Sequence, residues 1–292
     1  MYLATNVFSL VNPAAATDLL DLARVVEELG FDEIDLGDHV TIGRPLPGRP
    51  MPNPPAAALL EPLVALGALS AVTRRIRLGT GVLILPQRQP ALVAKQVATL
   101  DRLSNGRLRL AVGVGWQAPE YESLGVPFGE RGRRIDEAIE LMRLYWTQPS
   151  VTFHGRFYHS EAMAVDPPPV QPGGPPVWLG GGSEAALQRV GRLADGWLAV
   201  GEDPQSIRDK VSMITRAAQG AGRDPRSIGL HVLLGESSNL DRLASEAAAF
   251  RDAGFSGASV NLDQIIASGA RDLDRQRETL ARIKERIDKE TL

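Results

Sequence analysis

The chain has 292 residues and a formal net charge of −3, with 43% hydrophobic residues, 23% charged residues and no cysteine. The absence of cysteine excludes disulfide scaffolds, iron–sulfur clusters, thiolate zinc sites and cysteine nucleophiles. The small negative charge gives no general attraction to nucleic acid or anionic lipid, and no apolar run approaches the roughly 20 residues of a membrane-spanning helix. The first residues, MYLATNVFSLVNP, lack the pattern of a secretory signal. We therefore expect a cytoplasmic globular protein that binds neither nucleic acid nor membrane.

Strand-like segments alternate with amphipathic helical segments along the chain. Strands are predicted at 2–8, 32–38, 75–85, 107–115, 175–181, 195–200, 227–234 and 257–262, and helices at 16–29, 58–73, 90–103, 130–146, 183–193, 204–221, 240–253 and 271–289. Such alternation requires a parallel sheet with its helices outside. Eight strand–helix units indicate an α/β protein of the (β/α)8 TIM-barrel class, in one domain over residues 1–292. A doubly wound sheet is the alternative.

Two irregular segments interrupt this alternation. Residues 41–56 contain six prolines and follow the second strand, which places them on the rim where barrel active sites lie. Residues 147–175 follow the fourth helix and therefore begin at the opposite rim. Within them, VTFHGRFYH predicts a short hairpin around Gly155. Loops of this length in a compact domain are functional or disordered.

Two strand ends carry residues suited to binding or chemistry. DLGDHV at 35–40 places Asp38 and His39 at the C-terminal end of the second strand. A histidine beside an acid can exchange a proton or donate a hydrogen bond to a bound ring, although a polar loop cap would have the same pattern. In the third strand, LGTGVLIL at 78–85 contains two glycines, which indicate a bulge or a close backbone approach. Either a flat ligand or a packing requirement would explain them.

Two further strand ends are rich in glycine. GVGWQA at 113–118 has the spacing of a dinucleotide fingerprint, but Trp116 and Pro119 do not fit that motif. A strand end that lets a group approach the backbone is the better interpretation. WLGGGSEAAL at 178–187 ends a strand in three glycines, with Ser183 at the start of a helix. Backbone N–H groups there can bind an anion, and a plain helix cap is the alternative.

Other chemical signatures are missing. The sequence contains no HExxH or histidine-rich cluster and no GxSxG nucleophile motif, so we expect no metal site and no serine hydrolase. Charged residues gather around the fourth unit, and we interpret most of them as a solvated helix face and its entry. They are Glu120, Glu122, Arg131, Arg133 and Arg134.

Three segments together resemble the bacterial luciferase-like monooxygenase superfamily. They are ELGFDEIDLGDH at 28–39, the segment from RIRLGTGVLIL to LMRLYW at 75–146, and PPVWLGGGSEAALQRVGRLADGW at 175–197. The resemblance is strongest to the oxidoreductases that use the deazaflavin coenzyme F420. It implies a luciferase-like (β/α)8 barrel with the cofactor ring across the C-terminal strand ends, and a cis peptide bond between Gly81 and Val82.

The resemblance also implies roles for individual residues. Asp38 and His39 match a pair that contacts the ring, and His39 is the expected catalytic residue. The expected cofactor-binding residues are Thr80, Gly81, Val82, Gly113, Val114, Gly115, Gly180, Gly181, Gly182 and Ser183, of which the last four match the phosphate segment.

Two departures from the family pattern bear on the chemistry. Trp116 and Gln117 stand where some F420 relatives have an acid, so a general acid cannot be carried over to that position. Val114 stands where FMN-using luciferases often have an arginine, which favours F420 over FMN.

The expected function is F420-dependent hydride transfer to or from a small organic substrate. One alternative is an FMN-dependent monooxygenase that uses O2 and a separate reductase, and another is a non-catalytic flavin-binding protein. We also expect a homodimer, with apolar side chains of the helices at 58–73 and 90–103 in its interface.

Overall fold

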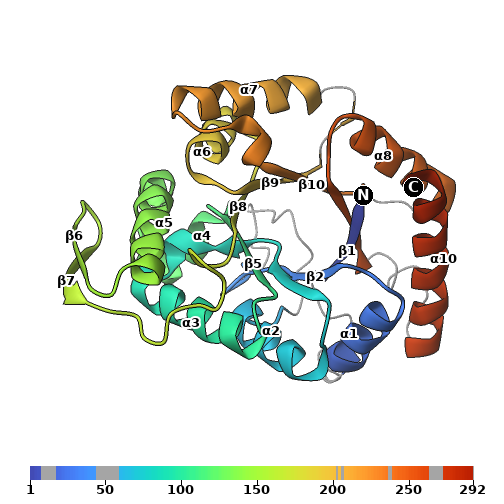
Figure 1. Ribbon diagram of the computed structural model, residues 1–292, viewed down its shortest axis with the longest axis horizontal. Helices are drawn as coiled ribbons and strands as arrows, with labels where there is room; N and C mark the ends of the chain where they lie inside the picture. The colour runs from blue at the N-terminus through green and yellow to red at the C-terminus, as the bar shows by residue number, and fades with distance from the viewer. Residues whose placement is uncertain are drawn as a thin grey trace.

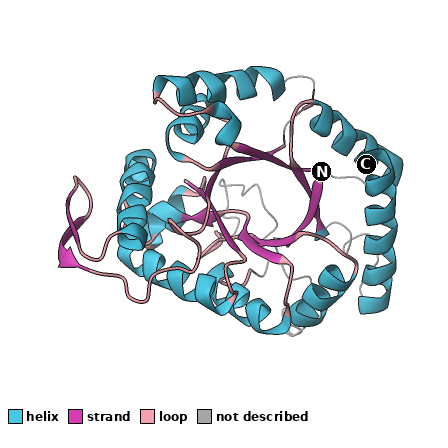
Figure 2. Ribbon diagram, viewed as in Figure 1, coloured by secondary structure: helices cyan, strands magenta, loops and turns pink. Residues whose placement is uncertain are grey.

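The computed structural model describes residues 1–7, 18–43, 59–201, 203–204, 207–235, 239–262 and 272–291. Its main sheet is parallel and consists of β1 (Tyr2–Val7), β2 (Glu33–Leu36), β3 (Arg77–Thr80), β4 (Leu83–Ile84), β5 (Leu108–Gly113), β8 (Val177–Gly180), β9 (Gly196–Val200), β10 (Gly229–Leu233) and β11 (Gly257–Asn261). β3 pairs with both β2 and β5, so the sheet closes. β3 and β4 are two parts of one strand position, and Figure 2 shows the resulting ring of strands. The predicted (β/α)8 barrel is confirmed.

The helices surround this ring (Figure 1). They are α1 (Asp18–Glu28), α2 (Pro62–Val72), α3 (Pro90–Leu103), α4 (Ala118–Ser123), α5 (Arg131–Thr147), α6 (Glu184–Leu193), α7 (Ile207–Gly220), α8 (Leu240–Asp252) and α10 (Leu273–Thr291), with short 3-10 turns at Leu85–Gln87, Phe128–Glu130 and Pro225–Ser227. The sequence analysis missed α4, because six residues are too few to show a helical period. Most of the proline-rich segment 41–56 lies outside the described residues.

The second irregular segment contains the predicted hairpin. β6 (Val151–His154) and β7 (His159–Met163) pair in antiparallel orientation and extend beyond α5 in Figure 1. The carboxylate of Glu137 in α5 accepts hydrogen bonds from the backbone N–H groups of Phe157 and Tyr158, at 2.9 and 2.7 Å. A Cβ atom at Gly155 would lie 1.9 Å from that carboxylate. The glycine therefore lets the hairpin turn rest on α5.

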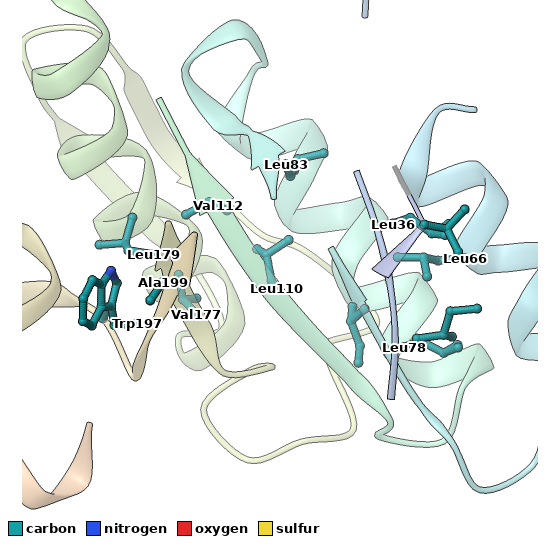
Figure 3. Close-up of a cluster of buried hydrophobic side chains, with 14 of the residues drawn as sticks. Leu36, Leu66, Leu78, Leu83, Leu110, Val112, Val177, Leu179, Trp197 and Ala199 are labelled. Atoms are coloured by element: carbon teal, nitrogen blue, oxygen red, sulfur yellow. The ribbon is translucent and has the colours of Figure 1, made fainter. Parts of the chain in front are cut away.

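The apolar core lies between the strands and the helices. Side chains alternate between the two faces of each strand, and on β5 Leu108, Leu110 and Val112 point outward into the core. Figure 3 shows Leu110 and Val112 between Leu179 of β8 on one side and Leu78 of β3 on the other, with Leu66 of α2 close to Leu36 of β2. These contacts hold the strand ends, and hence the site residues, in fixed positions.

Charged side chains fill part of the barrel interior. Arg109 of β5 forms ion pairs with Glu33 and Asp35 of β2, with 2.8 Å between Arg109 Nη2 and Asp35 Oδ1. Burial raises the pKa of Asp35, an effect that Arg109 opposes and Glu33 strengthens. A Cβ atom at Gly79 would lie 1.9 Å from Asp35 Oδ1. A packing requirement therefore accounts for the first of the two glycines in the third strand.

Candidate active site

His39 is held by a glutamate from another unit of the barrel. His39 follows β2 and is 8% exposed. Its Nδ1 lies 2.9 Å from Oε2 of Glu120 in α4, and Oε1 of Glu120 accepts hydrogen bonds from the N–H groups of Val40 at 2.7 Å and Thr41 at 3.2 Å. One carboxylate therefore binds both the imidazole and the backbone that follows it.

The surroundings of Glu120 favour its ionised form. Burial opposes its ionisation, but hydrogen bonds from His39 and from the Thr41 N–H group outweigh the burial and lower the pKa of Glu120 below its ordinary value. Among the charged residues of this unit, most of which were expected on a solvated helix face and its entry, Glu120 is an exception, because its side chain has no exposed area. Glu122 and Arg133 are exposed, as expected. The sequence could not show the contact because it joins residues 81 positions apart.

Gln117 and Trp116, which precede Glu120 in the chain, also contact the segment that follows β2. Gln117 accepts a hydrogen bond from the Gly43 N–H group at 2.7 Å and donates one to the Thr41 carbonyl at 2.9 Å. The ring of Trp116 lies 5.7 Å from that of His39 at 78°, and Trp116 is 44% exposed. The segment after β5 thus fixes residues 39–43 and places an indole beside the imidazole.

Asp38 is bound to the turn after β4. Its Oδ2 accepts hydrogen bonds from the Ile84 N–H group at 2.8 Å and from Arg88 Nη1 at 2.7 Å, and its Oδ1 accepts one from Arg88 Nη2 at 2.9 Å. Arg88 also reaches Glu61, which caps α2. This geometry gives Asp38 a structural role at the end of β2, and its contact with a ring stays a prediction.

Val82 lies where three strand ends meet. The Gly81–Val82 peptide bond is cis, as predicted. The Val82 side chain packs against a small apolar cluster of Ala111, Trp178 and Leu198 inside the barrel. Cβ atoms at Gly113 and Gly180 would lie only 2.7 and 2.9 Å from the Val82 methyl groups. The structure therefore brings these predicted cofactor residues together at the mouth of the barrel.

Three other predicted residues have different surroundings. Thr80 is buried and donates its hydroxyl to the Ala111 carbonyl at 2.6 Å, so its side chain joins β3 to β5. Gly115 has a φ of +64° and lies two residues after the end of β5. Gly181, with a φ of +107°, accepts a hydrogen bond from Trp197 through its carbonyl.

A pocket of about 280 Å³ adjoins the ends of β5 and β8. Its lining residues are Gly113, Val114, Gly129, Arg131, Gly132, Leu179, Gly180, Ser183, Ala185, Ala186 and Arg189. Ser183 caps α6, as predicted, and accepts a hydrogen bond from the Ala186 N–H group at 3.3 Å. The pocket thus unites four predicted cofactor residues with the start of a helix.

Two arginines that the sequence analysis did not assign to the site also line this pocket. Arg131 Nε is buried and has no hydrogen-bond partner among the described residues. Arg189 forms an ion pair with Asp136 and donates a hydrogen bond to the Gly132 carbonyl at 2.8 Å. An unsatisfied buried donor beside the N-terminus of α6 is an arrangement that suits an anion. Arg131 is thus half-buried at the pocket, whereas most of the charged residues of this unit were expected on a solvated face and its entry.

The described residues contain neither a candidate metal site nor a helix that could span a membrane. Within them, no group of three or more histidine, aspartate or glutamate side chains could hold a metal ion. The same part of the chain has no helix that is long and apolar enough to cross a membrane.

Several known proteins are similar to this chain in sequence. An uncharacterized protein of Mycobacterium tuberculosis is 37% identical over 214 residues, which are 71% of this chain and 73% of that protein. The F420-dependent glucose-6-phosphate dehydrogenase of Nakamurella multipartita is 34% identical over 218 residues, 71% of this chain and 59% of that protein. The FMNH2-dependent dimethylsulfone monooxygenase of Pseudomonas putida is 34% identical over 170 residues, 57% and 46% of the two chains.

Solved structures share the fold. Monooxygenase RslO1 from Streptomyces bottropensis has a TM-score of 0.80 at 22% identity and covers 99% of both chains. An F420-dependent secondary alcohol dehydrogenase in complex with an F420–acetone adduct has a TM-score of 0.79 at 17% identity and covers 98% of both chains. The family model for luciferase-like monooxygenases matches residues 1–290. This chain therefore belongs to the luciferase-like monooxygenase family.

Proposed function

We propose that this protein is an F420-dependent oxidoreductase that transfers a hydride to or from a small organic substrate. The observation that carries the proposal is the pocket of about 280 Å³ beside Val82, in which Ser183 and the unsatisfied Arg131 suit a phosphate. Similarity to the F420-dependent dehydrogenase supports it and spans 71% of this chain.

The residues present fit such a cofactor. Ser183, the N–H groups at the start of α6, Arg131 and Arg189 would hold its phosphate, because charged donors and a helix N-terminus favour an anion. Val82 and His39 would contact its ring. The bound deazaflavin supplies the hydride chemistry, and the protein supplies position and proton exchange. We assign the proton exchange to His39, which Glu120 orients.

A second candidate is an FMN-dependent monooxygenase, supported by the similarity to the dimethylsulfone monooxygenase over 57% of this chain. It would require O2 and a separate reductase. A non-catalytic flavin-binding protein would use the same pocket, and it would differ in binding a cofactor tightly without turnover.

Titration of the purified protein with F420 and FMN separately, followed by quenching of cofactor fluorescence, tests the proposal. We expect F420 to bind and FMN to bind at least tenfold more weakly. Ser183→Asp should abolish binding because its carboxylate would face the phosphate, while aspartate still caps α6. Tighter binding of FMN would support the second candidate instead, and binding of neither cofactor would refute both.

A further inference from the structure

The carboxylate of Glu120 makes two kinds of contact that together restrict the His39 ring. Its Oε1 accepts from two backbone N–H groups, those of Val40 and Thr41, and its Oε2 faces Nδ1 of His39 at 2.9 Å. All three groups come from the segment that follows β2, whereas Glu120 belongs to α4. We propose that Glu120 is the positioning residue of His39, which fixes the protonated nitrogen of the neutral imidazole as Nδ1 and leaves Nε2 as the accepting nitrogen.

The argument rests on which groups can donate. An ionised carboxylate only accepts hydrogen bonds, so Nδ1 must carry the proton if it is to bond to Oε2. A proton on Nε2 would instead leave two lone pairs facing each other across 2.9 Å. The lowered pKa of Glu120 agrees with an ionised carboxylate. A carboxylate or carbonyl partner on one ring nitrogen is a general means of setting the role of the other.

The residues beside this pair make contacts of their own. The Asp38 carboxylate, the nearest acid along the chain, is bound to Arg88 and to the Ile84 N–H group. Trp116 meets the imidazole through an aromatic contact at 78°. Gln117 Nε2 lies 3.4 Å from Glu120 Oε2, a long contact that supports the carboxylate from its other side.

The same geometry predicts that Glu120→Gln reverses the tautomer. The N–H groups of Val40 and Thr41 require an acceptor, so the amide oxygen of the new glutamine should occupy the position of Oε1. Its NH2 group would then face Nδ1 of His39. Because an NH2 group donates, Nδ1 would have to accept, and the proton would move to Nε2. If the amide were turned the other way, its NH2 group would face the N–H groups of Val40 and Thr41, and no acceptor would be available to them.

Proton-detected ¹⁵N NMR of the histidine rings in the ligand-free protein measures this directly, since protonated and unprotonated ring nitrogens resonate far apart. The spectra are recorded at alkaline pH, above the ordinary histidine pKa of about 6.5, and the His39 signals are assigned by their loss in His39→Gln. We expect an Nδ1–H tautomer in the natural protein and an Nε2–H tautomer in Glu120→Gln. Glu27→Gln is the matched control, because Glu27 also accepts backbone N–H groups, those of Arg75 and Ile76, but contacts no histidine.

An Nε2–H tautomer in the natural protein would overturn the proposal even if Glu120→Gln did not fold, and so would an unchanged Nδ1–H tautomer in a folded Glu120→Gln. The inference about catalysis rests on the proposed function, whereas the NMR measurement uses no cofactor, so the two can fail separately.

With F420 and a substrate, Glu120→Gln should lower kcat with little change in KM. The double variant Glu120→Gln/His39→Ala should be no slower than His39→Ala, because Glu120 acts through His39. Additive losses would show that Glu120 acts independently of His39 and would overturn the positioning role.

Discussion

Replacement of Arg131 should weaken cofactor binding more than any other neutral substitution on α5. Arg131 lines the pocket at the ends of β5 and β8, and its buried Nε has no partner among the described residues. Its Nη1 is bound to the Phe128 carbonyl at 2.9 Å and its guanidinium lies 3.7 Å from the Phe128 ring centre, so the side chain is already fixed in place. A phosphate in the pocket that accepts from the Arg131 guanidinium would therefore gain a charged hydrogen bond without ordering a flexible side chain.

The size of the effect follows from that bond. A hydrogen bond to a charged group contributes about 1.5–3 kcal/mol. Arg131 is half-buried, and screening by water reduces such terms, so the lower end of the range applies. About 1.5 kcal/mol corresponds to roughly a tenfold increase in Kd for Arg131→Gln. Arg131→Lys should lose less, because it keeps the charge but not the planar donors.

Fluorescence titration with F420 measures these Kd values, and Arg134→Gln is the control. Arg134 lies one turn further along α5, is not part of the pocket lining, and pairs with Glu130 at 2.9 Å. Its replacement changes the net charge by the same amount. Equal losses for Arg131→Gln and Arg134→Gln would mean that only the overall charge matters, and a Kd within twofold of the natural protein for Arg131→Gln would refute the assignment of the pocket.

Three further predictions concern other parts of the molecule. His39→Ala should change cofactor Kd by less than about tenfold but lower turnover by roughly 10²–10⁴, the usual effect of losing an acid–base group, and steady-state kinetics with F420 would test this. His231 is fully buried, and burial, followed by the charges of Arg109 and Arg77, holds its pKa well below the ordinary value. Its stabilising contribution is therefore complete above the unfolded pKa of about 6.5 and is lost as pH falls below it, by up to about 1.4 kcal/mol per pH unit. Urea unfolding between pH 7 and pH 5 should show this loss in the natural protein and not in His231→Gln. The exposed face of α2 contains Val64, 71% exposed, Ala68 and Ala71 and no charge. We expect sedimentation at twice the chain mass of 31.4 kDa, and a monomer for Val64→Glu.

The strand–helix order could be predicted because it depends on local patterns. α3 has the bounds that the sequence predicted, Pro90–Leu103, since proline favours the first helical turn and the apolar residues keep a regular period. Ser183 likewise caps α6 as expected. These features depend on residues within one or two turns of each other.

The charged part of the barrel interior and the His39–Glu120 pair could not be predicted, because both depend on distant residues. Alternation along β2 separates Glu33 and Asp35 from Ile34, but it does not tell which face a barrel encloses. Only closure of the sheet brings Arg109 to these carboxylates. Glu120 sits on a helix too short to be recognised, and its partner is 81 residues away.

The positive charge beside the pocket should affect how strongly F420 and FMN each bind. Val114 lacks the positive charge that FMN-using relatives often have at that position, but Arg131 and Arg189 line the same pocket from α5 and α6. Arg189 shares the carboxylate of Asp136 with Arg192, whereas Arg131 forms no ion pair with any described residue.

The phosphate of F420 is a phosphodiester and carries one negative charge. A phosphate monoester such as FMN carries about −1.5 to −2 at pH 7 and therefore depends more on the positive charge beside the pocket. Asp136→Asn would remove the carboxylate that Arg189 and Arg192 share, so it should strengthen FMN binding more than F420 binding. Asp136 is 30% exposed, so screening should limit the change in the ratio of the two Kd values to about threefold to tenfold. Parallel fluorescence titrations measure that ratio, and Glu140→Gln, an exposed acid on the same helix, controls for net charge. If the ratio is unchanged in Asp136→Asn, or changes equally in Glu140→Gln, then the Arg189–Asp136 ion pair does not determine the relative affinity for the two cofactors.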